Sequence, residues 1–294
     1  MQIKGASLID TTKIISKKAE SNINKIAEGL KSHGKLEEYD LLVLLVKYMV
    51  DLYRFEVNNY QENKSIPQMI SRTIMETYFY VLYLTKSKGN KAEYKIKKRA
   101  YTLIAKKDEV KKSINALSNP QLINTNNPKD IIQRDKAIEL ANKSNMNKSD
   151  LEERKDNIND TIKEFFDDHS ISISPKDFKD FYNVSKDTNG NYLHGLQSLA
   201  IYVNEGERYN LLMHQTSKRV HATNVYQECD VSSMAPISNL DDNIPIFISA
   251  LFVGNALKSI TDFCNIKSLF DKGLGSYVDK LKHEIQLNID EQMK

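Results

Sequence analysis

The chain has 294 residues, of which 40% are hydrophobic and 28% charged, and its formal net charge is +3. Only 10 glycines and 6 prolines interrupt a sequence rich in Lys, Glu, Leu and Ile, which favours helices over a sheet with many turns. The two cysteines, Cys229 and Cys264, lack CxxC spacing, so by themselves they cannot form a zinc site and we expect reduced thiols.

The sequence predicts neither export nor a membrane span. The N-terminus, M-Q-I-K-G-A-S-L-I-D, lacks the long apolar core of a signal peptide. The two most apolar runs, Leu41–Val50 and Ile244–Leu257, are shorter than the roughly 20 residues that cross a bilayer. We therefore expect a cytoplasmic protein without a membrane partner.

Apolar residues recur at helical spacing through the first 118 residues, where glycine-containing breaks separate the periodic segments. Four core helices are predicted there, at Thr11–Lys31, Glu37–Gln61, Ser65–Thr85 and Lys91–Leu117. After the loop Asn119–Pro128, two polar segments with thin apolar stripes predict a peripheral helical pair, at Lys129–Asn145 and Ser149–Asp168.

The last third of the chain predicts more core helices and one long loop. The helices are expected at Lys176–Lys186, Tyr192–Val203, Ile244–Cys264 and Lys267–Gln292, and the loop at Gln215–Asn243. Ala200–Met213 fits either a helix or a small β-hairpin. The sequence thus predicts a single all-α domain over residues 1–294, a multi-helix bundle. Its core helices lie at about 11–118 and 174–292, and its peripheral pair at about 127–168.

Arg72 and Glu76 are the only charged residues in Met69–Leu84, which is otherwise rich in apolar and aromatic side chains. This pattern predicts a helix buried on every face, with the two charges one turn apart. A buried ion pair gains little stability, because desolvation roughly cancels the attraction. The pair therefore calls for a functional reason.

The string S-R-T-I-M-E-T-Y-F-Y-V-L-Y-L resembles the R-x3-E helix of a large uncharacterised bacterial family of all-helical domains. F-Y-N-V-S-K-D-T-N-G-N-Y-L-H-G is similar to that family's Y-x2-S…H segment and would contribute Tyr182, Ser185 and His194, although the serine-to-histidine spacing is longer here. The resemblance covers roughly Glu37–Asn265 apart from the polar helices. Members of the family occur near mobile elements and phage-defence genes, so the resemblance implies a toxin or abortive-infection context and no particular reaction.

An arginine, a glutamate and a histidine inside a helical bundle could act on a phosphodiester. Arg72 would bind the phosphate, His194 would move a proton, and Glu76 would orient one of them. In the alternative interpretation these groups form a structural network, in which Tyr182 and Ser185 satisfy the remaining donors.

A second motif, R-Y-N-L-L-M-H, contains Arg208 and His214. It resembles the R-x4-6-H motif of the HEPN ribonucleases, helical bundles that cut RNA without a metal at a dimer cleft. This resemblance would make Arg208 and His214 the catalytic pair and would imply a homodimer.

Between Lys86 and Lys112 the chain has eleven Lys or Arg residues against three acids. The segment predicts a surface that follows a phosphate backbone, and Tyr94 and Tyr101 could stack on bases. The residues predicted to bind nucleic acid are Lys95, Lys98, Arg99, Lys106 and Lys107. The alternative is an ordinary solvated helix face.

Together these patterns favour a defence- or toxin-type effector acting on RNA or DNA, as a ribonuclease that needs no metal or other cofactor. The alternative is a non-catalytic helical module that binds a small ligand or a partner protein of a defence system.

Overall fold

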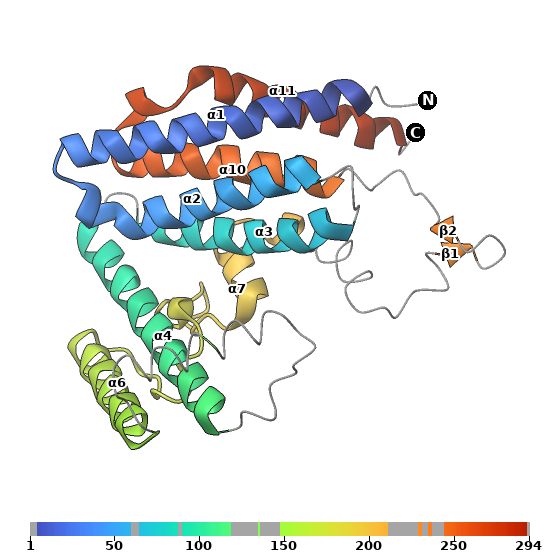
Figure 1. The fold of residues 1–294 in the computed structure, drawn as a ribbon. Coiled ribbons are helices and arrows are strands. Elements are labelled where there is room, and N and C mark those ends of the chain that lie inside the picture. Colours follow the sequence, from blue (N-terminus) through green and yellow to red (C-terminus); the bar gives the residue numbers. More distant parts are fainter. Residues whose placement is uncertain are drawn as a thin grey trace. The chain divides into compact units, whose positions relative to one another are not determined.

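The protein is all-α, as predicted, in a computed structural model that describes residues 5–59, 65–87, 90–118, 148–210 and 244–292, together with residue 135 and the pairs 229–230 and 235–236 (Figure 1). The α-helices are α1 (Gly5–Ser32), α2 (Leu36–Asn59), α3 (Ser65–Thr85), α4 (Lys91–Ser118), α6 (Lys148–Asp168), α7 (Gly195–Tyr202), α10 (Ile244–Phe263) and α11 (Lys272–Gln292). Short elements are the 3-10 turns η1 (Phe181–Val184) and η3 (Lys267–Leu269) and the antiparallel pair β1 (Cys229–Asp230) and β2 (Ala235–Pro236).

The chain divides into two compact units. The first consists of Met1–Tyr94 and Leu196–Lys294, and the second of Lys95–Gly195. The division falls within α4, so the first turn of this helix belongs to one unit and its remainder to the other. The expectation of a single domain stays a prediction.

In the first unit, α10 lies at the centre and packs against α1, α2, α3 and α11 (Figure 1). Its side chains are buried on several faces, including Phe252, Val253 and Ile260 at 0% exposure. Among the described residues, one helical segment, Pro245–Phe263, has the length and composition of a membrane span. However, 72% of it is buried inside the fold, as in the core helix of a bundle.

Hydrogen bonds fix the outer helices of this unit. The Tyr53 hydroxyl of α2 donates to the Thr12 carbonyl of α1 at 3.1 Å. The Asn22 amide of α1 donates to the Leu269 carbonyl of η3 at 2.7 Å. α1 ends where its sequence predicts, because Gly34 adopts φ +66° and lets the Lys35 N–H reach the Leu30 carbonyl at 2.9 Å.

In the second unit, the apolar stripes of α4 and α6 pack against each other through Val110, Ile114, Leu151 and Ile158. The segment 170–195 adds aromatic contacts, with the Phe166 and Phe178 rings 5.1 Å apart and the Tyr101 and Phe181 rings 5.0 Å apart. The acidic α6 therefore lies beside the basic α4, joined by apolar side chains.

The structure corrects two expected elements. Lys176–Lys186 is not an α-helix; it consists of turns and the 3-10 turn η1, because backbone groups there bond to side chains instead of to a helical ladder. The β-hairpin alternative for Ala200–Met213 is wrong over its described part, since α7 covers its start and residues 206–210 are helical. The helix expected at Lys129–Asn145 and the loop at Gln215–Asn243 lie outside the described residues, except for residue 135 and the β1–β2 pair.

We expect Gly254→Val to destabilise the protein by about 1–3 kcal/mol through overpacking of α10 against α11. A Cβ atom at Gly254 would lie 2.5 Å from Val278 Cγ2 and 3.1 Å from its Cγ1. Chemical denaturation measures the loss, and Val278→Ala in the same chain should recover part of it. Equal stability of the wild type and Gly254→Val would contradict this close approach.

Candidate functional site

Arg72 and Glu76 form the expected ion pair on α3, with Arg72 Nε 3.2 Å from Glu76 Oε1. Their side chains are 35% and 33% exposed, so the expectation of deep burial is wrong. The reason is that one face of α3, which also includes Thr73, is only partly covered. An ion pair this open to solvent contributes about 1 kcal/mol or less, so its presence alone does not demand a functional explanation.

Tyr182, Ser185 and His194 lie in the second unit, whereas Arg72 and Glu76 lie in the first. The structure therefore describes the predicted catalytic residues as two separate groups. Their meeting in one site stays a prediction.

Within the second unit, His194 is exposed and follows the turn at 187–190, in which the Gly190 N–H donates to the Asp187 carbonyl at 3.1 Å. The Leu193 N–H donates to the Ser185 carbonyl at 2.9 Å, which places these two strands of chain side by side. Between them, Asp187 accepts hydrogen bonds from the N–H groups of Asn189 at 2.8 Å and Asn191 at 2.9 Å. Tyr182 is buried at 2% exposure and Ser185 partly buried, so His194 is the member of this group that solvent reaches most freely.

Asn183 is the residue that organises this segment, and the sequence analysis did not single it out. It is fully buried, and its side-chain oxygen accepts from the N–H groups of Lys179 at 3.0 Å and Asp180 at 2.8 Å. Its amide nitrogen donates to the Leu193 carbonyl and lies 3.4 Å from His194 Nδ1. The available signal in the sequence was a lone amide that directly follows the aromatic pair Phe181 and Tyr182. Asn183 thus holds the backbone that presents His194.

Arg208 of the alternative motif is bound to an acid of the same unit. Its guanidinium contacts both carboxylate oxygens of Glu205, at 2.9 and 2.8 Å, and Glu205 is only 12% exposed. The Tyr78 hydroxyl donates to Glu205 at 3.2 Å. Burial, and then the negative charge of Glu205, raise the pKa of Tyr78. This arrangement attaches the start of the helical segment 206–210 to α3, while His214 lies outside the described residues.

The basic residues of α4 divide between two faces. Lys95, Arg99 and Lys106 follow each other by four and seven residues, so they share one face, and all three are exposed. Lys98 lies beside them and is partly buried. These four cations are called the α4 basic face below. Glu109, one turn after Lys106, ends it.

Lys107 lies about a quarter turn away from that face and has a structural contact. Its ammonium donates to the carbonyls of Pro175 at 2.6 Å and Phe178 at 2.8 Å. Burial is the main cause that lowers its pKa. Lys107 therefore holds the 175–178 segment on α4, and we assign it no place on the α4 basic face.

The two tyrosines expected to stack on bases are engaged within the fold. Tyr94 is 1% exposed and lies in an aromatic cluster, 5.7 Å from Tyr39 and 5.4 Å from Phe263 between ring centroids. Tyr101 packs edge-on against Phe181. The expectation of base stacking by Tyr94 is wrong, because the helix turns this side chain into the core.

A buried acid of α2 was not predicted from the sequence. Glu56 of α2 is fully buried, and the Ser71 hydroxyl of α3 donates to its Oε1 at 2.7 Å. The Ser249 hydroxyl of α10 donates in turn to Ser71 at 3.0 Å. Oε2 of Glu56 has no hydrogen-bond partner among the described residues. The spacing of the sequence could have predicted this burial, since Glu56 continues the buried series of Met49 and Tyr53 along one side of the helix.

Burial raises the pKa of Glu56 to about 8, and hydrogen bonds from Ser71 and Ser249 oppose this rise only partly. At neutral pH the carboxyl is therefore mostly protonated, so α2, α3 and α10 cross at a neutral acid instead of a buried charge. We assign the hydrogen-bonded group of Glu56, Ser71 and Ser249 a structural role in the bundle.

Among the described residues, no three His, Cys, Asp or Glu side chains gather closely enough to hold a metal ion. Comparisons of the chain with protein families, with curated proteins and with solved structures found no match. The resemblances drawn from the two sequence motifs therefore stay predictions beyond the all-helical fold.

We expect Glu56 to make the protein less stable as pH rises. The unfolded chain loses this proton near pH 4.5, whereas the folded chain keeps it until about pH 8. The stabilisation is thus complete below pH 4.5 and is lost as pH rises to 8, at about 1.4 kcal/mol per pH unit at most. Urea denaturation from pH 5 to pH 9 gives the free energy of unfolding of the wild type and of Glu56→Gln, which mimics the neutral acid. The difference between the two curves measures the loss that Glu56 causes.

Glu76→Gln is the matched control, because it neutralises an acid of the same bundle that is one-third exposed. If the wild type and Glu56→Gln lost stability in parallel over this range, the buried acid would not be the group that titrates.

Proposed function

We propose that the protein is a nucleic-acid-directed effector that contacts the phosphate backbone through the α4 basic face. The observation that carries the proposal is the shared exposure of Lys95, Arg99 and Lys106 on one side of one helix. These residues span about 16 Å along the axis, which is long enough to reach the phosphates of several nucleotides. Arginine adds bidentate phosphate contacts, and the lysines add positive charge.

The proposed reaction is metal-independent cleavage of RNA. His194 supports it, because this histidine is exposed on a turn braced by Asn183 and belongs to the same unit as the α4 basic face. As a general base it would take the proton of a ribose 2′-hydroxyl, which then attacks the adjacent phosphorus while the bond to the 5′-oxygen breaks. The leaving 5′-oxygen takes a proton from water, and the protonated His194 returns its proton to solvent. Arg72 and Glu76 belong to the other unit, so their part in binding and orienting the phosphate stays a prediction from the sequence.

A non-catalytic interaction module is the second candidate. It is favoured by the way the two arginines of the sequence motifs are already paired, Arg72 with Glu76 and Arg208 with Glu205. In that case the polar residues organise the bundle, and the surface binds a partner without chemistry.

Reversing Lys95, Arg99 and Lys106 to glutamate should weaken binding of a single-stranded RNA by at least about tenfold at low salt, since three phosphate contacts are lost. The slope of log K against log salt should become shallower by about 2, at roughly 0.7 per lost contact. Fluorescence anisotropy with a labelled RNA over a salt series measures both quantities.

The matched control reverses Arg154, Lys155 and Lys163 of α6, three exposed cations of the same unit. It changes the net charge equally and should alter affinity and slope much less. If both triple variants bound RNA equally weakly, the loss of affinity would follow from net charge alone, and the α4 basic face would be refuted as the binding surface.

His194→Ala should lower RNA cleavage about 10²–10⁴-fold while the melting temperature stays unchanged, as loss of a proton-transferring group does. EDTA should have no effect, because the proposed chemistry uses side chains alone. His169→Ala, at an exposed histidine of the same unit, is the control and should remain active. His214→Ala tests the rival motif. If His214→Ala loses activity and His194→Ala keeps it, the catalytic site is at Arg208 and His214. If no variant and no wild-type preparation cuts RNA, the interaction module is the better account.

A further inference from the structure

The outward face of α2 exposes large apolar side chains. Leu44 is 62% exposed, Tyr48 49% and Phe55 51%. The steps of four and seven residues put the three side chains on one side of the helix. One exposed apolar residue is ordinary, whereas a row of three on one helix face is a candidate interaction surface.

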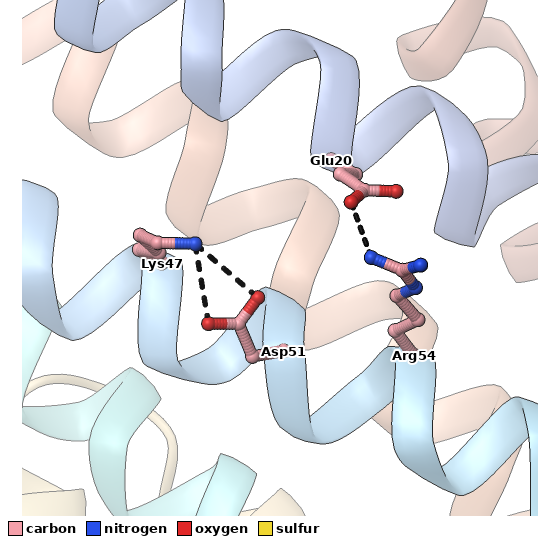
Figure 2. A network of polar contacts seen from close by, with 4 residues as sticks. All are labelled: Glu20, Lys47, Asp51 and Arg54. Atoms are coloured by element: carbon pink, nitrogen blue, oxygen red, sulfur yellow. Dashed lines mark hydrogen bonds and ion pairs between the residues drawn. The ribbon is translucent and has the colours of Figure 1, made fainter.

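Two charged residues complete this surface, which is called the α2 face below. Lys47 and Asp51 are each 53% exposed, and Lys47 Nζ lies 3.3 Å from an Asp51 oxygen (Figure 2). A cation that precedes an anion by four residues is the weaker order of such pairs, so both groups can exchange partners at low cost. Next to them, Arg54 is already bound to Glu20 of α1 (Figure 2).

We propose that the α2 face binds the α2 face of a second copy of the chain, with the two helices antiparallel. A two-fold axis between residues 49 and 50 places Leu44 opposite Phe55 of the second copy. The same axis places Lys47 beside Asp51 of the second copy, and Tyr48 next to that carboxylate.

Charge complementarity selects both this partner and this direction. The positive charge lies before the centre of the stripe and the negative charge after it, so reversing one helix brings opposite charges together. A parallel arrangement would put Lys47 beside Lys47 and Asp51 beside Asp51. The face is thus complementary to itself, as a two-fold contact between identical chains requires.

The size of the face sets the expected strength. Leu44 to Phe55 spans about 16 Å along a single helix, and one helix face of this length buries less area than the roughly 800 Å² per partner of stable complexes. The dimer should therefore be weak and should depend on concentration.

Sedimentation equilibrium on the full chain from about 10 µM to about 1 mM tests the proposal, because weak interfaces populate a dimer in this range. The average mass of the wild type should rise with concentration, and Leu44→Glu should keep the mass of one chain. Ile201→Glu is the matched control, since Ile201 of α7 is also 62% exposed but lies off the α2 face. A wild type that stays monomeric, or an Ile201→Glu variant as impaired as Leu44→Glu, would overturn the proposal.

Disulfide trapping tests the antiparallel direction, with Cys229→Ser as background and Cys264 left in its buried position. Mixing Leu44→Cys and Phe55→Cys chains under mild oxidation should yield a cross-linked dimer of one chain of each kind. Leu44→Cys alone should cross-link poorly, because the two-fold axis separates its two copies by about 16 Å along the helix. Efficient cross-linking of Leu44→Cys with itself would show a parallel contact and refute the geometry.

Discussion

The first unit depends on the burial of α10. Apolar side chains such as Ile246, Phe252 and Val253 are fully buried in this helix, so other helices must exclude water from several of its faces at once. α1, α2, α3 and α11 do so, and α11 approaches closely enough for its Val278 to occupy the space of a side chain at Gly254. These four helices take their positions because together they must cover the apolar surface of α10.

The same burial explains the protonated acid. Ser249 belongs to α10, and its hydroxyl starts the chain of hydrogen bonds that passes through Ser71 to Glu56. Charge at this depth would have to be neutralised by a nearby cation. The carboxyl is instead mostly protonated near neutral pH, because desolvation outweighs the two hydroxyl contacts. A polar link between three helices is thereby achieved without a buried ion pair.

Because the buried polar groups of the described residues serve the fold, we place the proposed functions on exposed helix faces and on the turn that carries His194. In the second unit this is the α4 basic face, where Lys95, Arg99 and Lys106 have no acid among them before Glu109. In the first unit it is the α2 face, with its exposed leucine and aromatic rings. The proposed functions, phosphate binding and self-association, use different chemistry and can be tested separately.

Much of the helical order was predictable, because helical spacing depends on neighbours three and four residues away. The periodic segments of α1 to α4, α6 and α10 are present near their expected bounds, and Arg72 and Glu76 do pair across one turn. The prediction of an α-helix at Lys176–Lys186 was wrong, because the side-chain oxygen of Asn183 accepts hydrogen bonds from the backbone N–H groups of Lys179 and Asp180. Helical spacing carries no information about such a competing partner.

The amino-acid sequence by itself determined the fold class, most helix positions and the basic character of α4. Only the tertiary structure decided which side chains are free to act. Lys107 and Lys106 are neighbours in the sequence, yet one ammonium bonds to two carbonyls and the other faces solvent. Tyr94 and Glu56 are buried because other helices cover them. Spacing along one helix assigns a side chain to a face, but which face is covered depends on packing between segments distant in the chain.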